Sequence, residues 1–343
     1  MYIKDNKAIF LIKPYSIEIK NNIIDKELDK NEVLIKIKYA SICETDLKIF
    51  RGEIPNVKFP IILGHEAVGE VIETGGNVIY LSTGDKVLID PNIYCGVCSS
   101  CRALKYNLCL NGGLLGKERD GVLQEYIIIQ ERNLYKLPSS VNIKSAPLIQ
   151  PLSTVIHSQK LLTINPNDYA MVIGMGVTGL MHTRLLKEKG AKVLCVSRFD
   201  EKANLVKKFG GDFFLNIKDK NFEDEINKIT EREGVDVLID TSANVELIYT
   251  LLKYLKPHGQ FLSFGITSKI GNIPMYELYY KEAKIIFSRS SLPKDFVDAI
   301  NFVKDNRIDL DMLIDRYINI NNIEQILNEA THKFRSIVNF NLS

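Results

Sequence analysis

The chain has 343 residues, of which 45% are apolar and 25% are charged, and its formal net charge is +2. This length accommodates two domains with separate cores, and the balanced charge gives no sign of a nucleic acid or a membrane surface as partner. No apolar run is long enough to span a membrane, and the opening residues MYIKDNKAIF lack the apolar core of a signal peptide, so we expect a cytoplasmic protein.

The first 140 or so residues alternate short apolar runs with turn residues. Examples are the runs at residues 33–40, 67–76, 84–89 and 123–129. Many short strands separated by turns are typical of a β-barrel or a β-sandwich, and not of alternating strands and helices. This part of the chain is therefore predicted to be all-β.

Three side chains of this region could together bind a metal ion. Cys43 lies in SICETDL, and His65 and Glu66 lie in LGHEAVGEV, so the set offers sulfur, nitrogen and oxygen donors. A catalytic zinc site has about three protein ligands and one open position. Each residue alone is more often a packed core residue, and it is the combination that favours a metal site.

Four further cysteines lie close together, Cys95, Cys98, Cys101 and Cys109, with the spacing C-x2-C-x2-C-x7-C. In a reducing compartment clustered cysteines are more often metal ligands than disulfides. Four thiolates fill the coordination shell of zinc, which makes this a closed, structural site. An iron–sulfur cluster is the alternative; zinc is favoured because a zinc-type donor set precedes the cluster.

The second half of the chain has a different rhythm. Short apolar strands at residues 169–174, 191–197, 235–241, 259–265 and 283–288 alternate with amphipathic helical segments. This alternation predicts a parallel sheet covered by helices on both faces. The tail ends in another strand-like run, residues 336–343, which could return to the first domain.

A glycine-rich turn follows the first of these strands. Gly174, Gly176 and Gly179 form G-x-G-x-x-G, with Val177 and Thr178 between them, at the start of a helix. The strand, the helix and a second strand at the right spacing predict a dinucleotide site, with the pyrophosphate at the helix N-terminus.

The tip of the second strand distinguishes the two nicotinamide dinucleotides. An acidic residue there binds the ribose of NAD, whereas an arginine accommodates the 2′-phosphate of NADP. This sequence has Ser197 and Arg198, with Lys202 one turn later, which favours NADP(H) and leaves NAD(H) as the alternative. In a simpler interpretation Arg198 stacks on adenine or faces solvent, and Asp200 caps the following helix.

These motifs together, in this order and spacing, resemble the zinc-containing medium-chain alcohol and polyol dehydrogenases. They are ICETDLKIFRG, PIILGHEAVGEV, GDKV, the four-cysteine lobe, DGVLQEY and GMGVTGL. The resemblance implies a GroES-like β-barrel catalytic domain at residues 1–148, with a structural zinc lobe at 91–112. It also implies a Rossmann dinucleotide-binding domain at 149–288, a segment at 289–343 that returns to the first domain, and a homodimer or homotetramer.

The resemblance also implies roles for individual residues. Cys43 and His65 would be ligands of a catalytic zinc, and Glu66 a direct or exchanging ligand. Asp46 would orient the ligating imidazole, and the Thr45 hydroxyl would receive the substrate proton. Two zinc ions per chain are expected.

Two positions depart from the family pattern. Gln150 stands where cysteine, glutamate or aspartate is common on the zinc side; a glutamine oxygen can ligate zinc but brings no charge. Lys48 stands where many members have a histidine that relays the proton to solvent, and lysine relays poorly at neutral pH unless its pKa is lowered.

The sequence thus predicts a zinc-dependent oxidoreductase that prefers NADP(H) and acts on a secondary alcohol of a sugar or polyol, or on the matching carbonyl compound. The same fold acting on simple alcohols or aldehydes is the first alternative. A dinucleotide-binding redox sensor without catalysis is the second. A zinc-ribbon module for nucleic acids is disfavoured by the absence of a basic stripe.

Overall fold

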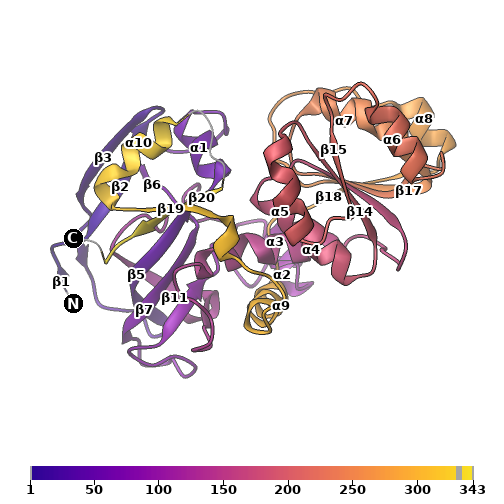
Figure 1. The fold of residues 1–343 in the computed structure, drawn as a ribbon. Coiled ribbons are helices and arrows are strands. Elements are labelled where there is room, and N and C mark those ends of the chain that lie inside the picture. The colour runs from indigo at the N-terminus through magenta and orange to yellow at the C-terminus, as the bar shows by residue number, and fades with distance from the viewer. Residues whose placement is uncertain (1, 330–333, 342–343) are drawn as a thin grey trace. The chain divides into compact units, whose positions relative to one another are not determined.

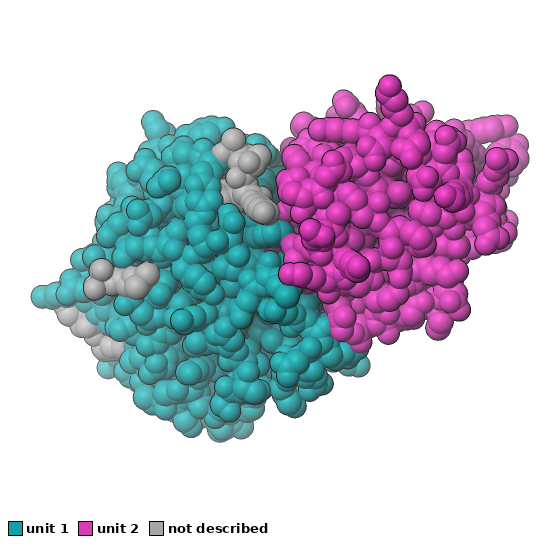
Figure 2. Space-filling model, in the orientation of Figure 1, with its two compact units in different colours: residues 1–153, 290–343 teal, residues 154–289 magenta. Residues whose placement is uncertain are grey.

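The computed structural model describes residues 2–329 and 334–341. The chain forms two units, which Figure 2 colours separately: unit 1 comprises residues 1–153 and 290–343, and unit 2 comprises residues 154–289. The predicted C-terminal segment at 289–343 includes residues 330–333 and 342–343, which lie outside the described residues.

Unit 1 is built on a seven-stranded, mostly antiparallel sheet. In spatial order its strands are β12 (Leu134–Lys136), β8 (Lys86–Ile89), β7 (Glu66–Thr74), β5 (Glu32–Ile42), β20 (Arg335–Asn339) and β19 (Ile314–Ile318), with β11 (Tyr126–Gln130) paired to β5. The C-terminal strand β20, yellow in Figure 1, is hydrogen-bonded to the N-terminal strand β5 and places Ile337 opposite Ser41. Both ends of the chain therefore contribute to one sheet.

Smaller elements complete unit 1. The remaining strands are β1 (Tyr2–Ile3) with β4 (Ile24–Asp25), β9 (Asn92–Ile93) with β10 (Gly113–Leu114), and β3 (Ser16–Asn21), β2 (Lys7–Lys13) and β6 (Ile61–Ile62). Its helices are α1 (Glu44–Phe50), α2 (Ser99–Arg102), α9 (Pro293–Lys304) and α10 (Ile323–Asn328). The apolar side chains that alternate along β5, β7 and β8 share one buried core with α1 and α10.

Unit 2 is a six-stranded sheet in which every pair is parallel. The order is β15 (Phe213–Asn216), β14 (Lys192–Ser197), β13 (Tyr169–Ile173), β16 (Val235–Asp240), β17 (Leu255–Ser263) and β18 (Lys284–Phe287). The GroES-like and Rossmann fold classes predicted from the sequence are confirmed.

The order of the strands in unit 2 determines which face of the sheet each helix covers. They are α4 (Val177–Glu188), α5 (Ala203–Lys208), α6 (Phe222–Ile229), α7 (Val245–Leu251) and α8 (Met275–Tyr280), and α3 (Ile149–Gln159) begins in unit 1. Right-handed crossovers place α4 and α5 on one face and the other three on the opposite face. The strand order changes direction between β13 and β16, and ligands of such sheets bind at this switch point.

Candidate metal centres and dinucleotide turn

Cys43, His65 and Glu66 come together at the ends of two neighbouring strands. Cys43 follows β5 and is the N-cap of α1, while His65 immediately precedes β7, where Glu66 pairs with Ser41 of β5. One donor atom from each of the three residues lies within 4.8 Å of the others. His65 and Glu66 are 6% and 1% exposed. The structure thus assembles the dispersed donor set that the sequence predicted.

Asp46 holds this set in place. It is fully buried, and its Oδ2 accepts a hydrogen bond from the Cys43 backbone N–H at 2.8 Å. Its Oδ1 lies 3.2 Å from both the Gly64 backbone nitrogen and His65 Nδ1. Because Nδ1 faces a carboxylate, Nε2 is the nitrogen left for a metal. Asp46 therefore stands where the resemblance implies an orienting carboxylate.

The electrostatics of His65 follow from these neighbours. Burial alone would lower the pKa of His65, but the Asp46 carboxylate and Cys43 outweigh burial and raise it well above its usual range. An imidazole must be neutral to ligate a metal, so metal binding here would release a proton.

Gly64 fixes the approach to His65. Its φ of +92° lies in the left-handed region, and a Cβ at this position would come 2.7 Å from Leu123 Cγ. A larger residue would therefore displace either the segment 120–126 or His65.

Glu66 already has partners within the protein. Arg335 of β20 donates from Nε to Oε2 at 3.0 Å and from Nη2 to Oε1 at 2.8 Å, and the Ser41 hydroxyl donates to Oε2. Arg335 Nη2 also lies 3.2 Å from Cys43 Sγ. Burial opposes the charge on Arg335, but Cys43 and Glu66 raise the pKa of its guanidinium above its usual range. The cluster therefore contains a buried cation that the sequence did not identify.

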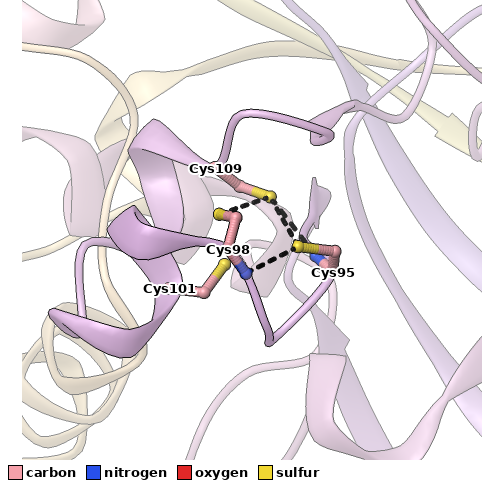
Figure 3. Close-up of side chains that lie close together, drawn as sticks. All are labelled: Cys95, Cys98, Cys101 and Cys109. Atoms are coloured by element: carbon pink, nitrogen blue, oxygen red, sulfur yellow. Dashed lines mark hydrogen bonds between the residues drawn. The ribbon is translucent and has the colours of Figure 1, made fainter.

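The four cysteines of the lobe fit a single zinc ion. Figure 3 shows them pointing toward one another, and one sulfur from each lies within 4.8 Å of the others. Cys109 Sγ lies 3.6 Å from Cys95 Sγ and 3.8 Å from Cys98 Sγ. Sulfurs at the corners of a tetrahedron with Zn–S bonds of about 2.3 Å are about 3.8 Å apart. These spacings match zinc and exclude a disulfide, whose S–S bond is about 2.05 Å.

Backbone amides prepare the lobe for anionic sulfur. The Cys98 N–H points to Cys95 Sγ and the Cys95 N–H to Cys109 Sγ. Hydrogen bonds from the backbone of Val97 and Cys98 lower the pKa of the Cys95 thiol to about 6. The thiolate form that ligates metal is thus favoured at this position.

The glycine-rich turn has the backbone geometry that a pyrophosphate requires. Gly176 is the N-cap of α4, and a Cβ built on it would meet nothing within 4 Å. A Cβ on Gly179 would instead collide with the Gly174 carbonyl oxygen, because helix and turn pack closely there. The open position at Gly176 lets the backbone approach a pyrophosphate, and the closed position at Gly179 lets the helix pack against the strand, which are the tasks of these two glycines in a dinucleotide site.

The tip of β14 carries a buried hydroxyl and an exposed guanidinium. Ser197 is 7% exposed and its Oγ accepts the Phe199 N–H, while Arg198 is exposed and stacks over the Phe199 ring. Asp200 is no helix cap; its Oδ1 accepts a hydrogen bond from Asn216 Nδ2 at 2.8 Å. Lys202 is 7% exposed, so it lies deeper than Arg198.

Comparison with known proteins identifies the family. Residues 29–139 match the family described as alcohol dehydrogenase GroES-like domain, and residues 177–305 the one described as zinc-binding dehydrogenase. A D-arabitol-phosphate dehydrogenase from Enterococcus avium is 30% identical over 293 residues, which are 84% of this chain and 83% of the relative. The chain belongs to the zinc-containing medium-chain alcohol and polyol dehydrogenases. It is accordingly an oxidoreductase.

Other members of this dehydrogenase family agree over most of the chain. A sorbitol dehydrogenase from Bacillus subtilis is 30% identical over 298 residues, which are 85% of this chain and 84% of the relative. A zinc-binding dehydrogenase from Sinorhizobium meliloti, solved with NADP bound, has a TM-score of 0.88 at 25% identity and covers 97% of this chain and 99% of its own. Along residues 2–329 and 334–341, none of the helices combines the length and low polarity needed to cross a lipid bilayer.

The remaining predicted zinc-side residues of this dehydrogenase lie on α1 and α3. Thr45 and Lys48 are half-buried on α1, next to Cys43 and Asp46 in the chain. Gln150 is 4% exposed in the first turn of α3, and its backbone carbonyl accepts a hydrogen bond from Ser153 Oγ at 2.6 Å. Cys43, His65 and Glu66 are thus brought together by their side chains, whereas a role for Gln150 in the same set stays a prediction.

Proposed function

We propose that this dehydrogenase transfers hydride between NADP(H) and a secondary alcohol of a sugar or polyol. In this proposal unit 1 is the catalytic domain and unit 2 the dinucleotide-binding domain. The observation that carries it is the pair Cys43 and His65, a half-buried thiol and a buried imidazole that Asp46 orients and whose donor atoms lie within 4.8 Å of each other. Such a set leaves room for a substrate oxygen.

Each residue then has a chemical task. Zinc, when bound, supplies a Lewis acid that polarises the substrate oxygen. Cys43 Sγ and His65 Nε2 would hold the metal, and Asp46 fixes the imidazole through Nδ1. The Thr45 hydroxyl receives the proton of the alcohol. Arg335 balances the negative charge of Glu66 and Cys43.

Glu66 and Gln150 compete for the place of a further ligand. Glu66 would have to give up its hydrogen bonds to Arg335 and Ser41 in order to reach a metal, so we propose that it ligates only in exchange. Gln150 would then be the neutral ligand whenever Glu66 is bonded to Arg335 and Ser41.

Gln150→Glu tests this arrangement. The added carboxylate is expected to shift the pH–rate profile to higher pH, because a nearby negative charge disfavours the loss of the substrate proton. Steady-state rates measured across a range of pH check the shift, with Gln130→Glu on β11 as the control. An unchanged profile for Gln150→Glu would place that side chain outside the metal shell.

The substrate and cofactor are tested together. The relatives include dehydrogenases of D-arabitol phosphate and of sorbitol, and the solved relative was crystallised with NADP. We expect kcat/KM to be higher for polyols, free or phosphorylated, than for ethanol and other short alcohols, and higher with NADPH than with NADH for the matching ketones. A lower KM for every short alcohol tested than for any polyol rejects the polyol assignment in favour of simple alcohols.

Arg198→Ala tests the cofactor preference. The exposed guanidinium at the tip of β14 is proposed to bind the 2′-phosphate, so its loss should raise KM for NADPH about tenfold and leave KM for NADH unchanged. Lys207→Ala, which removes another cation from the same unit, is the control. Equal effects of Arg198→Ala on the two cofactors would contradict the assignment.

Self-association is proposed through the edge of the parallel sheet. Strand β18 has one hydrogen-bonded neighbour, and Phe287 at its end is 71% exposed. Tyr276, Tyr279 and Tyr280 of α8 are 68% to 77% exposed. An open strand edge that ends in an exposed aromatic side chain favours pairing with a second copy of the chain, and the exposed tyrosines of α8 add apolar surface to the same unit.

Phe287→Glu should therefore lower the molecular mass in solution, measured by light scattering, to that of one chain. Ile79→Glu changes an even more exposed residue of unit 1, 93% exposed, and should leave the mass unaltered. A monomeric wild-type protein would rule out the homodimer or homotetramer.

A further inference from the structure

A buried polar cluster lies where the chain leaves and re-enters unit 1. Unit 1 ends at Ser153 and resumes at Ser290, so the chain passes between the units twice. Ser153 and Ser291 are 0% and 1% exposed, and their Oγ atoms are 3.0 Å apart. The two connections are thus hydrogen-bonded to each other inside unit 1.

Asn92 ties these connections to the base of the cysteine lobe. It is 6% exposed, and its Nδ2 donates to Asp90 Oδ1 at 2.7 Å and to the Ser291 carbonyl at 3.4 Å. Its Oδ1 accepts a hydrogen bond from Ser290 Oγ at 2.5 Å. Both ends of one amide side chain are therefore used on the segment that re-enters unit 1.

Asp90 and Asn133 in turn fix Asn92. Asp90 is 2% exposed and also accepts the Asn92 backbone N–H. The Asn133 side chain donates to the backbone carbonyls of Asp90 and Asn92. Asn92, at the start of the lobe, is consequently held by residues that directly follow β8 and precede β12 in the sheet of unit 1.

Ser290 adopts a backbone conformation that needs such support. Its φ of +52° lies in the left-handed region, which costs a non-glycine residue roughly 1 kcal/mol or more. If the hydrogen bonds that hold Ser290 in this region are lost, its backbone can rotate to a conformation of lower energy.

We propose that Asn92 is a positioning residue for a hinge. Asp90, Asn92, Ser153, Ser290 and Ser291, here called the hinge anchor, hold both connections at one point of unit 1. Any movement of unit 2 during turnover must be absorbed by the residues just beyond this anchor, because hinges consist of a few residues at the ends of elements. The effect on turnover rests on the proposed function; the restraint of the connections does not.

Amide hydrogen exchange tests the restraint without substrate or cofactor. In Asn92→Ala the backbone amides of residues 152–156 and 288–292 should both exchange about tenfold faster, because the hydrogen bonds of the Asn92 side chain to Ser290, Ser291 and Asp90 are lost. Ser153→Ala, which removes only a hydroxyl, should give the same pattern if Asn92→Ala folds poorly. Asn6→Ala, a change of another fully buried asparagine of unit 1, should leave both segments as in the wild type. Unchanged exchange in either segment of both anchor variants would overturn the proposal.

A double-mutant cycle separates one anchor from independent contacts. The side chains of Asn92 and Ser153 are linked through Ser291, so Asn92→Ala and Ser153→Ala should be non-additive in their effect on exchange. Additive effects would show two unrelated contacts and overturn the common anchor.

The kinetic readout concerns cofactor binding. Freed connections gain conformational freedom that binding must remove, so KM for NADPH should rise about tenfold, while the single-turnover rate at saturation changes less than about twofold. A fall in the single-turnover rate with an unchanged KM would contradict the hinge role. Failure of NADPH to support any turnover in the wild type would instead reject the proposed function and leave the exchange result standing.

Discussion

Replacement of Arg335 by methionine is expected to lower the free energy of unfolding by about 3 to 5 kcal/mol, because it leaves Glu66 as a buried carboxylate without its cation. Glu66 is 1% exposed, and two of its hydrogen bonds come from Arg335. Methionine retains much of the apolar stem of arginine, so the lower free energy of unfolding comes from the lost charge and not from a cavity. Urea unfolding of the purified variant measures it.

Two variants decide whether the ion pair causes this loss. Adding Glu66→Gln to Arg335→Met removes the unpaired charge and should recover part of the stability. Arg316→Met is the matched control. Arg316 lies on β19, the strand next to β20, and pairs with Glu329 at 2.8 Å, but its side chain is 37% exposed. The control should lose less than about 1 kcal/mol. An equal loss in Arg316→Met and Arg335→Met would contradict a buried role for Arg335.

Cys43→Ser is expected to lose turnover while it keeps its stability, and Cys95→Ser is expected to lose stability first. The wild-type protein should contain about two zinc ions per chain, as the two donor sets require. Cys43→Ser should keep about one zinc ion and a stability close to that of the wild type, but lose more than about 99% of turnover, because its donor belongs to the proposed catalytic site. Cys95→Ser should also lose about one zinc ion, but lose stability first, because metal binding in the lobe contributes folding free energy.

Metal analysis, thermal unfolding and initial rates on the same preparations separate these outcomes. Cys195→Ala is the control, since Cys195 is buried in β14 and belongs to neither donor set. It should retain both ions and full turnover. A wild-type protein with about one zinc ion would show that one of the two sites is not filled, and persistent turnover in Cys43→Ser would remove Cys43 from the catalytic site.

Local patterns made much of the molecule predictable. The four lobe cysteines lie within fifteen residues of one another, so their spacing alone nearly closes a tetrahedron. Gly174, Gly176 and Gly179 are equally local: Gly174 and Gly179 stand where a Cβ would be crowded, and Gly176 leaves an open position in the same turn. Constraints of this kind act between residues close in sequence, so they do not depend on how the rest of the chain folds.

Arg335 could not be found in this way. It lies 269 residues from Glu66, and only the pairing of β20 with β5 brings the two together. The available signal was a single arginine at the start of the apolar run RSIVNF, where a charge must be paired if it is buried. That signal marks a buried cation but does not name its partner. Asn92 and Ser291 escaped for the same reason, since 199 residues separate them.

The position of Arg335 in the last strand affects how the protein is made. Unit 2 is continuous, from residue 154 to 289, and can fold as soon as it leaves the ribosome, whereas unit 1 waits for residues 290–343. At about 5 to 20 residues per second, a newly made Glu66 spends on the order of 10 to 60 seconds before its arginine is synthesised. During synthesis the cluster of Cys43, His65 and Glu66 therefore exists first without Arg335, and a chain released before its final strand would have unit 2 folded and the cation that pairs with Glu66 missing.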